Sequence, residues 1–375
     1  MSLKKFFILI SLSLLLPLFA YALSDAKVTG PCSNCHTMHN SQNGSAVAKD
    51  GAGTGWDGSG QLTGGSVQGT PKNNLLVTSC VGCHSSTTNQ TIINLSGNRI
   101  PIVFNTVPPA YMTPGPTNAL AGGNFYWAKN VNDDRGHNVY GISAADSRLS
   151  DAPGRNEGGG CMVGCHLTLA NPPTGSGTFY QGGCQGCHLK PSHHVDNGIY
   201  RFLTGMNYDP NNSGYATWVG NYGYQDYIKG TEDPDWEQTN SRTKHNYYQG
   251  ATGAYAGFGH NVENHSITAF CSGCHGVFHS NMGTSSPWIR HPNDVSLPTT
   301  GEYGGYDPVN SYSVEAPVAW LDPANPSRTG AVLMCLSCHR PHGSPYPSML
   351  RWDYNTMVAG GGGSGGCFTC HTQKN

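Results

Sequence analysis

Fourteen cysteines fall into seven pairs, and a histidine follows each pair directly. Six pairs have the spacing C-x-x-C-H, which is the attachment pattern of haem c. The two thiols bond to the two vinyl groups of one haem, and the next imidazole coordinates the iron as its proximal ligand. The six regular motifs are Cys32, Cys35 and His36; Cys80, Cys83 and His84; Cys184, Cys187 and His188; Cys271, Cys274 and His275; Cys335, Cys338 and His339; and Cys367, Cys370 and His371.

The seventh site has one extra residue between its cysteines. It consists of Cys161, Cys165 and His166. One added residue can bulge outward while the two sulfurs keep their separation, so we expect a haem here too, attached through both thiols. Attachment through a single thioether is the alternative.

Other uses of paired cysteines fit this pattern poorly. A zinc site needs two cysteine pairs, or a cysteine pair with two histidines, and does not require a histidine after every pair. A thioredoxin-like C-x-x-C motif occurs once per domain. We therefore expect seven covalently bound haems c.

Ten of the 17 histidines remain after the seven proximal ones. They are numerous enough to give every iron a second imidazole, so all seven haems can be bis-histidine. His39 and His342 stand three residues after a proximal histidine, and such a side chain reaches a neighbouring haem more easily than its own. The candidate distal ligands are His39, His137, His193, His194, His245, His279, His291 and His342.

Two choices among these candidates stay open. The adjacent His193 and His194 are expected to supply one ligand, from either residue. His137 and His245 share the pattern H-N-x-Y, which favours His245 over His260 and His265. A methionine ligand is not required, because histidine is not limiting.

The composition predicts an unusual core. Charged residues make up 11% of the 375-residue chain against roughly 25% in ordinary domains, and the sequence contains 51 Gly and 24 Pro. The 20 Lys and Arg do not exceed the 22 Asp and Glu, so nucleic acid is not an expected partner. Periodic apolar segments are scarce. We expect an irregular, loop-rich multihaem cytochrome c with short helices near the motifs, few strands and a core of stacked haems.

The N-terminus predicts export. Lys4 and Lys5 precede an apolar run, and Ala20-Tyr21-Ala22 has the pattern of a cleavage site, so residues 1–22 are expected to be a signal peptide. Residues 23–375 then form one heptahaem domain with no membrane span, because no other stretch approaches about 18 apolar residues. The expected location is extracellular or at the cell surface, with the periplasm as the alternative.

Two motif regions resemble a known group. The run from Cys32 to Ser41 resembles the opening of the filament-forming extracellular multihaem cytochromes of metal-reducing bacteria. The run from Cys335 to Gly343 looks like the wider doubled C-x-x-C-H group. In the filament family the histidine matching His39 ligates a haem of the next subunit, so the resemblance implies a homopolymer. Such a head-to-tail interface either closes into a ring or grows into a filament.

The predicted function is electron conduction through seven bis-histidine haems, in a polymer that exchanges electrons with other redox proteins or extracellular acceptors. A carrier that does not polymerise is the alternative. A haem enzyme, such as one converting nitrite or hydroxylamine, needs an iron with an open position. The sequence has no C-x-x-C-K site and has spare histidines, so we expect no enzymatic activity.

Overall fold

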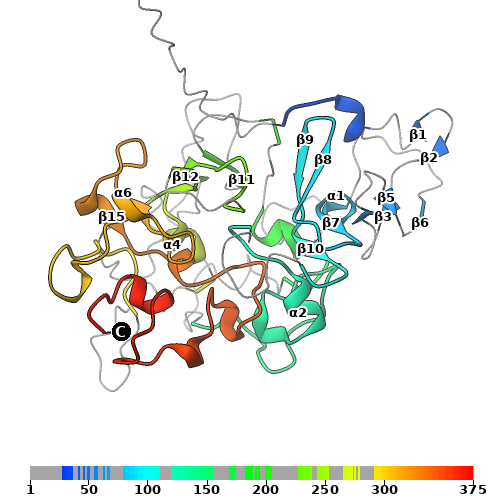
Figure 1. Cartoon of the computed structure of the whole chain (residues 1–375). Coiled ribbons are helices and arrows are strands. Elements are labelled where there is room, and N and C mark those ends of the chain that lie inside the picture. The colour runs from blue at the N-terminus through cyan, green and yellow to red at the C-terminus, as the bar shows by residue number, and fades with distance from the viewer. Residues whose placement is uncertain are drawn as a thin grey trace, which may run out of the picture.

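In the computed structural model, the N-terminal and C-terminal parts of the described chain lie on different sides of the molecule. The N-terminal strands β1–β10 lie on the right of Figure 1, and the C-terminal segment, orange to red, lies on the left and below. The structure describes residues 28–36, 41–42, 45–46, 49–50, 55–57, 62–63, 66–67, 79–109, 120–154, 169–173, 182–188, 191, 193–194, 199–204, 227–238, 243–252, 265–272, 274–275, 278 and 291–374.

Several predicted features lie outside these described residues. They are the signal peptide 1–22, the irregular motif formed by Cys161, Cys165 and His166, and the histidines His39, His260 and His279.

Helices in the described residues are short, and many coincide with a C-x-x-C-H motif. The α-helices are α1 (Cys80–His84), α2 (Tyr126–Asn130), α4 (Ile267–Cys271) and α6 (Pro308–Ser311). The 3-10 helices are η1 (Cys32–Asn34), η4 (Asp133–Arg135), η5 (Gly183–Gly186), η7 (Gly301–Tyr303), η8 (Arg328–Gly330), η9 (Cys335–Ser337), η10 (Pro347–Met349), η11 (Tyr354–Thr356) and η12 (Gly366–Thr369). No described helix has the length and apolar character needed to cross a membrane.

Strands are also short, and they pair into small sheets. A five-stranded sheet has the order β11-β12-β13-β14-β15, and a four-stranded sheet has the order β10-β7-β4-β5. The remaining strands form the antiparallel pairs β1-β2, β3-β6 and β8-β9. The strands are β1 (Ser41–Gln42), β2 (Ser45–Ala46), β3 (Lys49–Asp50), β4 (Gly55–Trp56), β5 (Leu62–Thr63), β6 (Ser66–Val67), β7 (Ser85–Ser86), β8 (Ile92–Leu95), β9 (Asn98–Pro101), β10 (Phe104–Asn105), β11 (Ile199–Thr204), β12 (Tyr227–Thr231), β13 (Tyr247–Gln249), β14 (Ala319–Trp320) and β15 (Ala331–Val332).

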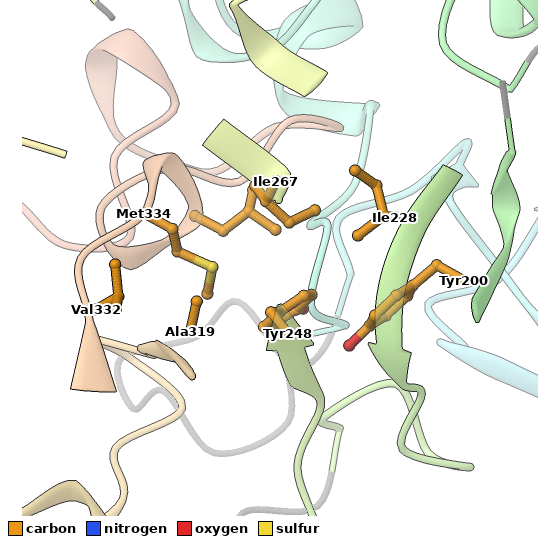
Figure 2. Close-up of a cluster of buried hydrophobic side chains, with 8 residues drawn as sticks. Tyr200, Ile228, Tyr248, Ile267, Ala319, Val332 and Met334 are labelled. Carbon is orange, nitrogen blue, oxygen red and sulfur yellow. The ribbon is translucent and has the colours of Figure 1, made fainter. Parts of the chain in front are cut away.

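The loop-rich fold expected from the sequence is confirmed. The sequence did not predict the buried apolar clusters that the described residues also form. In the cluster of Figure 2, the rings of Tyr200 and Tyr248 stack with centroids 5.1 Å apart and an interplanar angle of 6°. Ile228, Ile267 and Met334 pack around them. Aromatic and aliphatic contacts therefore join the five-stranded sheet to the motif-bearing helices α4 and η9.

Two buried arginines connect the C-terminal segment to residues 120–121. Arg340 donates hydrogen bonds from its guanidinium to the carbonyl of Leu120 at 2.7 Å and to Glu315 at 2.8 Å. Arg351 donates to the carbonyls of Leu336, Val314 and Ala121 at 2.6, 2.8 and 3.2 Å. Because both side chains are buried, these bonds satisfy donors that water does not reach. They hold together segments that lie far apart in the sequence.

Candidate haem-binding site

Each described C-x-x-C-H motif forms a single helical turn. The backbone N–H of the histidine donates to the carbonyl of the first cysteine, over 2.8 Å at His36 and His188, 3.0 Å at His275 and His371 and 3.1 Å at His339. Helix α1 gives the motif ending at His84 the same shape. Residues three and four positions apart share one face of a helix, so this turn places both sulfurs and the imidazole on one side. The described cysteines are all free of disulfides.

The irregular motif is the exception to this description. Cys161, Cys165 and His166 all lie outside the described residues, so the structure gives neither the shape of their turn nor a histidine opposite His166. The haem expected there, and the choice between one thioether and two, stay predictions from the sequence.

The backbone directly before Cys367 requires a glycine, at position 366. Gly366 has a φ of 54°, in the left-handed region that glycine adopts without strain. A Cβ on Gly366 would lie 2.6 Å from Met357 Sδ and 3.0 Å from the ring of Trp352. The glycine run before this motif therefore permits a tight turn against the neighbouring segment.

Backbone carbonyls fix the orientation of four proximal imidazoles. The Nδ1–H of His84 donates to Pro101 over 2.9 Å, and that of His339 donates to Ser348 over 2.9 Å. His188 and His275 donate likewise to the carbonyls of Phe202 and Pro153, both over 2.6 Å. A carbonyl oxygen only accepts, so the proton is on Nδ1 and the lone pair of Nε2 remains available to a metal ion.

Five proximal histidines lie opposite a second histidine ring. Their ring centroids are 6.0–6.2 Å apart, too far for direct stacking contact. The pairs, with the proximal residue first, are His36–His194 at 6.1 Å, His84–His193 at 6.2 Å, His188–His342 at 6.0 Å, His275–His137 at 6.1 Å and His371–His291 at 6.2 Å.

This separation fits one iron between two rings. With a metal–nitrogen bond of about 2.0 Å on each side and a ring centre roughly 1.1 Å behind each nitrogen, trans imidazoles have centroids about 6 Å apart. Among the described residues, no group of three or more His, Cys, Asp or Glu side chains is arranged to hold a bare metal ion. The two thiols of each motif would attach haem c, and the paired imidazoles have the spacing needed to bind its iron from both sides.

The loop Pro341–Gly343 holds two of the distal candidates. His342 lies opposite His188 rather than its sequence neighbour His339, and the carbonyl of Pro341 accepts the Nδ1–H of His137 over 2.8 Å. Gly123, with a φ of 81°, pairs with Gly343, and a Cβ at Gly123 would clash with the Gly343 carbonyl. This close backbone approach seats the loop against residues 120–124.

Burial keeps these imidazoles neutral. It lowers the pKa of His342 to about 3, and nearby His188 adds to that shift. Burial also lowers the pKa values of His137 and His188. A neutral imidazole is the form that coordinates a metal ion, so these three residues present ligands at neutral pH.

The adjacent His193 and His194 differ from the expectation that they supply a single ligand. His193 lies opposite His84 with an interplanar angle of 23°, and His194 lies opposite His36 with an angle of 16°. Phe202 stands edge-on to His193, His84 and His188, with centroids 4.8, 6.3 and 6.2 Å away. The two adjacent histidines thus face the proximal histidines of two different motifs. The ring of Phe202 packs beside three of the histidine rings in this region.

The proximal His371 has a different hydrogen-bond partner. Its Nδ1 lies 3.0 Å from Oε1 of Glu302, and Lys374 Nζ lies 3.3 Å from the other oxygen of that carboxylate. The hydrogen bond with Tyr303 lowers the pKa of Glu302, with smaller contributions from His371 and Lys374. The carboxylate is therefore ionised at neutral pH. The ring of His291, opposite His371, is turned by 82°.

The structure places His245 beside two tyrosine rings. His245 is buried, and its described ring contacts are with Tyr312 at 3.5 Å and Tyr247 at 4.1 Å. Its counterpart in the H-N-x-Y repeat, His137, does face a proximal histidine. No described histidine ring lies opposite His339. The prediction of His245 as a ligand stays a prediction.

Cysteines of different described motifs adjoin one another. Cys80 hydrogen-bonds Cys184, and Cys271 hydrogen-bonds Cys335. Burial raises the pKa of the Cys83 thiol to about 12, and nearby Cys35 adds to the shift. The attachment edges at these motifs therefore lie close together.

The same adjacency continues toward the C-terminus. Burial, and then nearby Cys187, raises the pKa of the Cys274 thiol to about 12. Burial, and then nearby Cys367 and Cys370, raises that of Cys338 to about 12. The six described motifs follow one another in space in the order of the sequence.

Sequence reasoning missed Phe202 and Glu302. Neither residue belongs to a motif, and each reaches its histidine through the fold. No local pattern in the sequence identifies them.

Comparisons with known proteins agree with the interpretation of the motifs. Residues 325–375 match the family model of the doubled CXXCH motif. The C-type cytochrome OmcS of Geobacter sulfurreducens is 24% identical over 396 residues, covering 89% of this chain and 82% of OmcS. Two solved structures from the same organism are also similar. They are the OmcS nanowires, with 18% identity, coverage of 93% and 91% of the two chains and a TM-score of 0.46, and the Outer Membrane Cytochrome S Filament, with 20%, 88% and 85%, and 0.39.

The sequence match to OmcS extends through most of both chains, and the family match covers the last two motifs. Seven cysteine pairs, each followed by a histidine, account for every cysteine in the sequence. Together these findings identify the chain as a multihaem c-type cytochrome related to OmcS.

Proposed function

We propose that this chain is a heptahaem cytochrome that conducts electrons along a row of bis-histidine haems c. The observation that carries the proposal is the set of five histidine pairs with ring centroids 6.0–6.2 Å apart, each containing the proximal histidine of a C-x-x-C-H motif. Each bound haem would supply an iron that alternates between Fe(III) and Fe(II). The chain's own contribution is to cap the iron on both faces, because a six-coordinate iron transfers electrons without binding substrate.

A continuous path is supported by the order of the motifs. Neighbouring motifs share contacts between their cysteines, as at Cys80 with Cys184 and at Cys271 with Cys335. His193 and His194 face two successive proximal histidines from adjacent positions. Haems bound at these motifs would therefore be close neighbours, and electrons would need no separate carrier between them.

The seventh haem belongs to the same proposal and rests on sequence. Cys161 and Cys165 would attach it, and His166 would be its proximal ligand. Intact-mass measurement of the haem-loaded protein tests this site. Seven haems per chain support it, and six haems in a protein with every regular motif loaded would rule it out.

Polymerisation is a further part of the proposal. The relatives include a filament and nanowires formed by OmcS. His339 is a proximal histidine with no described histidine opposite it, and His39 is the residue whose counterpart in the filament family leaves its own subunit. We assign His39 of one copy to the haem at His339 of the next. Such a contact is heterologous, and it extends the haem row from subunit to subunit.

The expected location follows from the signal peptide predicted at residues 1–22 and from the relative described as an outer membrane cytochrome filament. An exported polymer of this kind would deliver electrons to acceptors outside the cell. A carrier that remains monomeric in the periplasm or on the cell surface is the alternative, and it shares all the intrachain ligation.

Negative-stain imaging of the haem-loaded protein tests the polymer. Wild-type protein should form uniform thin fibres, whereas His39→Ala should give dispersed particles and one five-coordinate, high-spin haem per chain. His279→Ala is the matched comparison, since His279 also follows a proximal histidine closely in the sequence, and this variant should still form fibres. If His39→Ala still forms fibres with every haem six-coordinate, the intersubunit assignment is wrong. Dispersed wild-type particles would favour the monomeric carrier.

A further inference from the structure

The C-terminal motif differs from four other described motifs in what accepts the Nδ1 proton of its proximal histidine. At His84, His188, His275 and His339 the acceptor is a neutral backbone carbonyl. At His371 it is the carboxylate of Glu302, 3.0 Å away. Only a carboxylate places a full negative charge next to the axial imidazole.

Several contacts fix this carboxylate in place. Thr372 Oγ1 donates to the backbone carbonyl of Glu302 over 2.7 Å, which joins η7 to the residues directly after the motif. Arg328 donates to the carbonyls of Pro298, before η7, and of Tyr303, the last residue of η7, at 2.6 and 3.2 Å. Lys374 approaches the outer oxygen of Glu302 at 3.3 Å. The Glu302 side chain is therefore directed at His371 by a braced turn rather than by a lone surface ion pair.

We propose that Glu302 is a positioning residue that lowers the reduction potential of the haem held by His371, so that this haem differs energetically from the rest of the row. This inference rests on the proposed function, because it requires a haem at Cys367 and Cys370. A negative charge hydrogen-bonded to Nδ1 makes the imidazole a stronger electron donor, and that stabilises Fe(III) over Fe(II). Lys374, on the other oxygen, withdraws part of that charge and moderates the effect.

The geometry supplies a spectroscopic marker for this haem. The planes of His371 and His291 differ by 82°, whereas the other described pairs differ by 16°, 23°, 48° and 57°. In low-spin ferric haem, nearly perpendicular imidazole planes give an EPR signal with a large gmax, and nearly parallel planes give a rhombic signal. Loss of the large-gmax signal in His291→Ala assigns it to this haem.

An EPR-monitored redox titration of the intact haem-loaded protein tests the inference. Glu302→Gln keeps a hydrogen-bond acceptor but removes the charge, and it should shift the Fe(III)/Fe(II) equilibrium of the large-gmax haem toward Fe(II) by about tenfold, or ~59 mV for one electron. Lys374→Gln should shift the same equilibrium in the opposite direction. Asp322→Asn is the charge-matched control, because the described hydrogen bonds of the Asp322 side chain all lie within its own surface turn, at Ala324 and Asn325. It should leave the signal's midpoint unchanged.

The possible outcomes distinguish a failure of the tuning role of Glu302 from a failure of the proposed haem site. If Glu302→Gln shifts the midpoint no more than Asp322→Asn does, or if Lys374→Gln shifts it in the same direction as Glu302→Gln, the tuning role is wrong while the haem remains. If the wild-type protein has no large-gmax signal and peptide mapping finds Cys367 and Cys370 without haem, the C-terminal haem site itself is absent.

Discussion

The candidate haem sites at the two ends of the described chain are built in contrasting ways. Near the N-terminus, His36 and His84 face two adjacent histidines that come from far along the sequence, and the paired rings are nearly parallel. Near the C-terminus, His291 and His371 lie within one continuously described segment, 291–374, and their rings are nearly perpendicular. The first pair of sites is assembled from separate segments of the described chain, and the second is assembled by packing within one continuously described segment.

This difference shows that one motif accommodates different surroundings. The C-x-x-C-H turn fixes the proximal half of each described site from five residues, as the repeated bonds from histidine to first cysteine show. The distal half is free to come from any segment that the fold brings across. Nδ1 partners also vary, from the Pro101 carbonyl to the Glu302 carboxylate. Under the proposed function, variation in these outer parts would give otherwise equal haems different properties.

The largest expected effect comes from removing the distal histidines of the two N-terminal sites. His193→Ala and His194→Ala should each convert one low-spin haem to a five-coordinate, high-spin haem, because each removes a separate distal imidazole. The double variant should convert two haems, whereas His291→Ala at the other end should convert one. Resonance Raman spin-state markers measure this, with Pro191→Ala as a control in the same segment. A His193→Ala protein with every haem still six-coordinate would rule out the pairing with His84.

The second prediction breaks the connection between the two regions. Arg351→Met removes three hydrogen bonds and takes this donor from the buried carbonyls of Leu336 and Val314, while Ala121 keeps its bond from Arg340. It should lower the free energy of unfolding by about 3–5 kcal/mol in denaturant titrations. The more exposed Arg99, paired with Asp235, is the control, and Arg99→Met should cost about 0–1 kcal/mol. Equal effects of the two substitutions would show that the buried junction is not important.

The third prediction concerns a buried carboxyl beside that junction. Burial raises the pKa of Glu237 from 4.5 to about 7, against the opposing charge of Arg351. Between those pH values the folded chain retains a proton that the unfolded chain has released, so stability falls as the pH rises. The slope contributed by Glu237 approaches 1.4 kcal/mol per pH unit at most, or about 3 kcal/mol over the window.

Unfolding titrations at a series of pH values check this contribution. Glu237→Gln should flatten the decline between pH 4.5 and 7, since glutamine carries no titrating proton. If wild type and variant lose stability in parallel, Glu237 is not the group responsible. The proteins should be compared at constant ionic strength, because salt screens the charges nearby.

The smallest effect compares the caps of two motif-bearing helices. Ser266 caps α4, since its side chain accepts a hydrogen bond from the N–H of Ala269 at 3.1 Å. Ser79 stands at the same position of α1 but makes no such bond. Ser266→Ala should therefore destabilise the protein by about 1 kcal/mol, and Ser79→Ala should have almost no effect. Thermal unfolding followed at the Soret band measures both effects. A larger loss of stability in Ser79→Ala than in Ser266→Ala would contradict this prediction.

Much of the proximal half of these sites could be predicted from the sequence, because the motif is local and its chemistry requires both cysteines and the histidine. Distal partners were harder to predict. His342 reaches His188 only because Gly123 and Gly343 allow two backbones to approach closely, and no spacing in the sequence encodes that.

Contacts made only in the folded chain account for the rest. The joint use of His193 and His194, and the contact of Glu302 with His371, both depend on segments that lie far apart in the sequence. The loop-rich character followed from composition, whereas the apolar clusters around Tyr200 and Trp320 did not.

A structure of the haem-loaded protein, determined by cryo-electron microscopy at side-chain resolution, tests the central claim most directly. The account predicts one iron between the two rings of each of the five pairs, with His193 and His194 bound to the haems of His84 and His36. Density that places the two histidines of any pair on different irons, or that leaves their proximal haem with an open face, would contradict it.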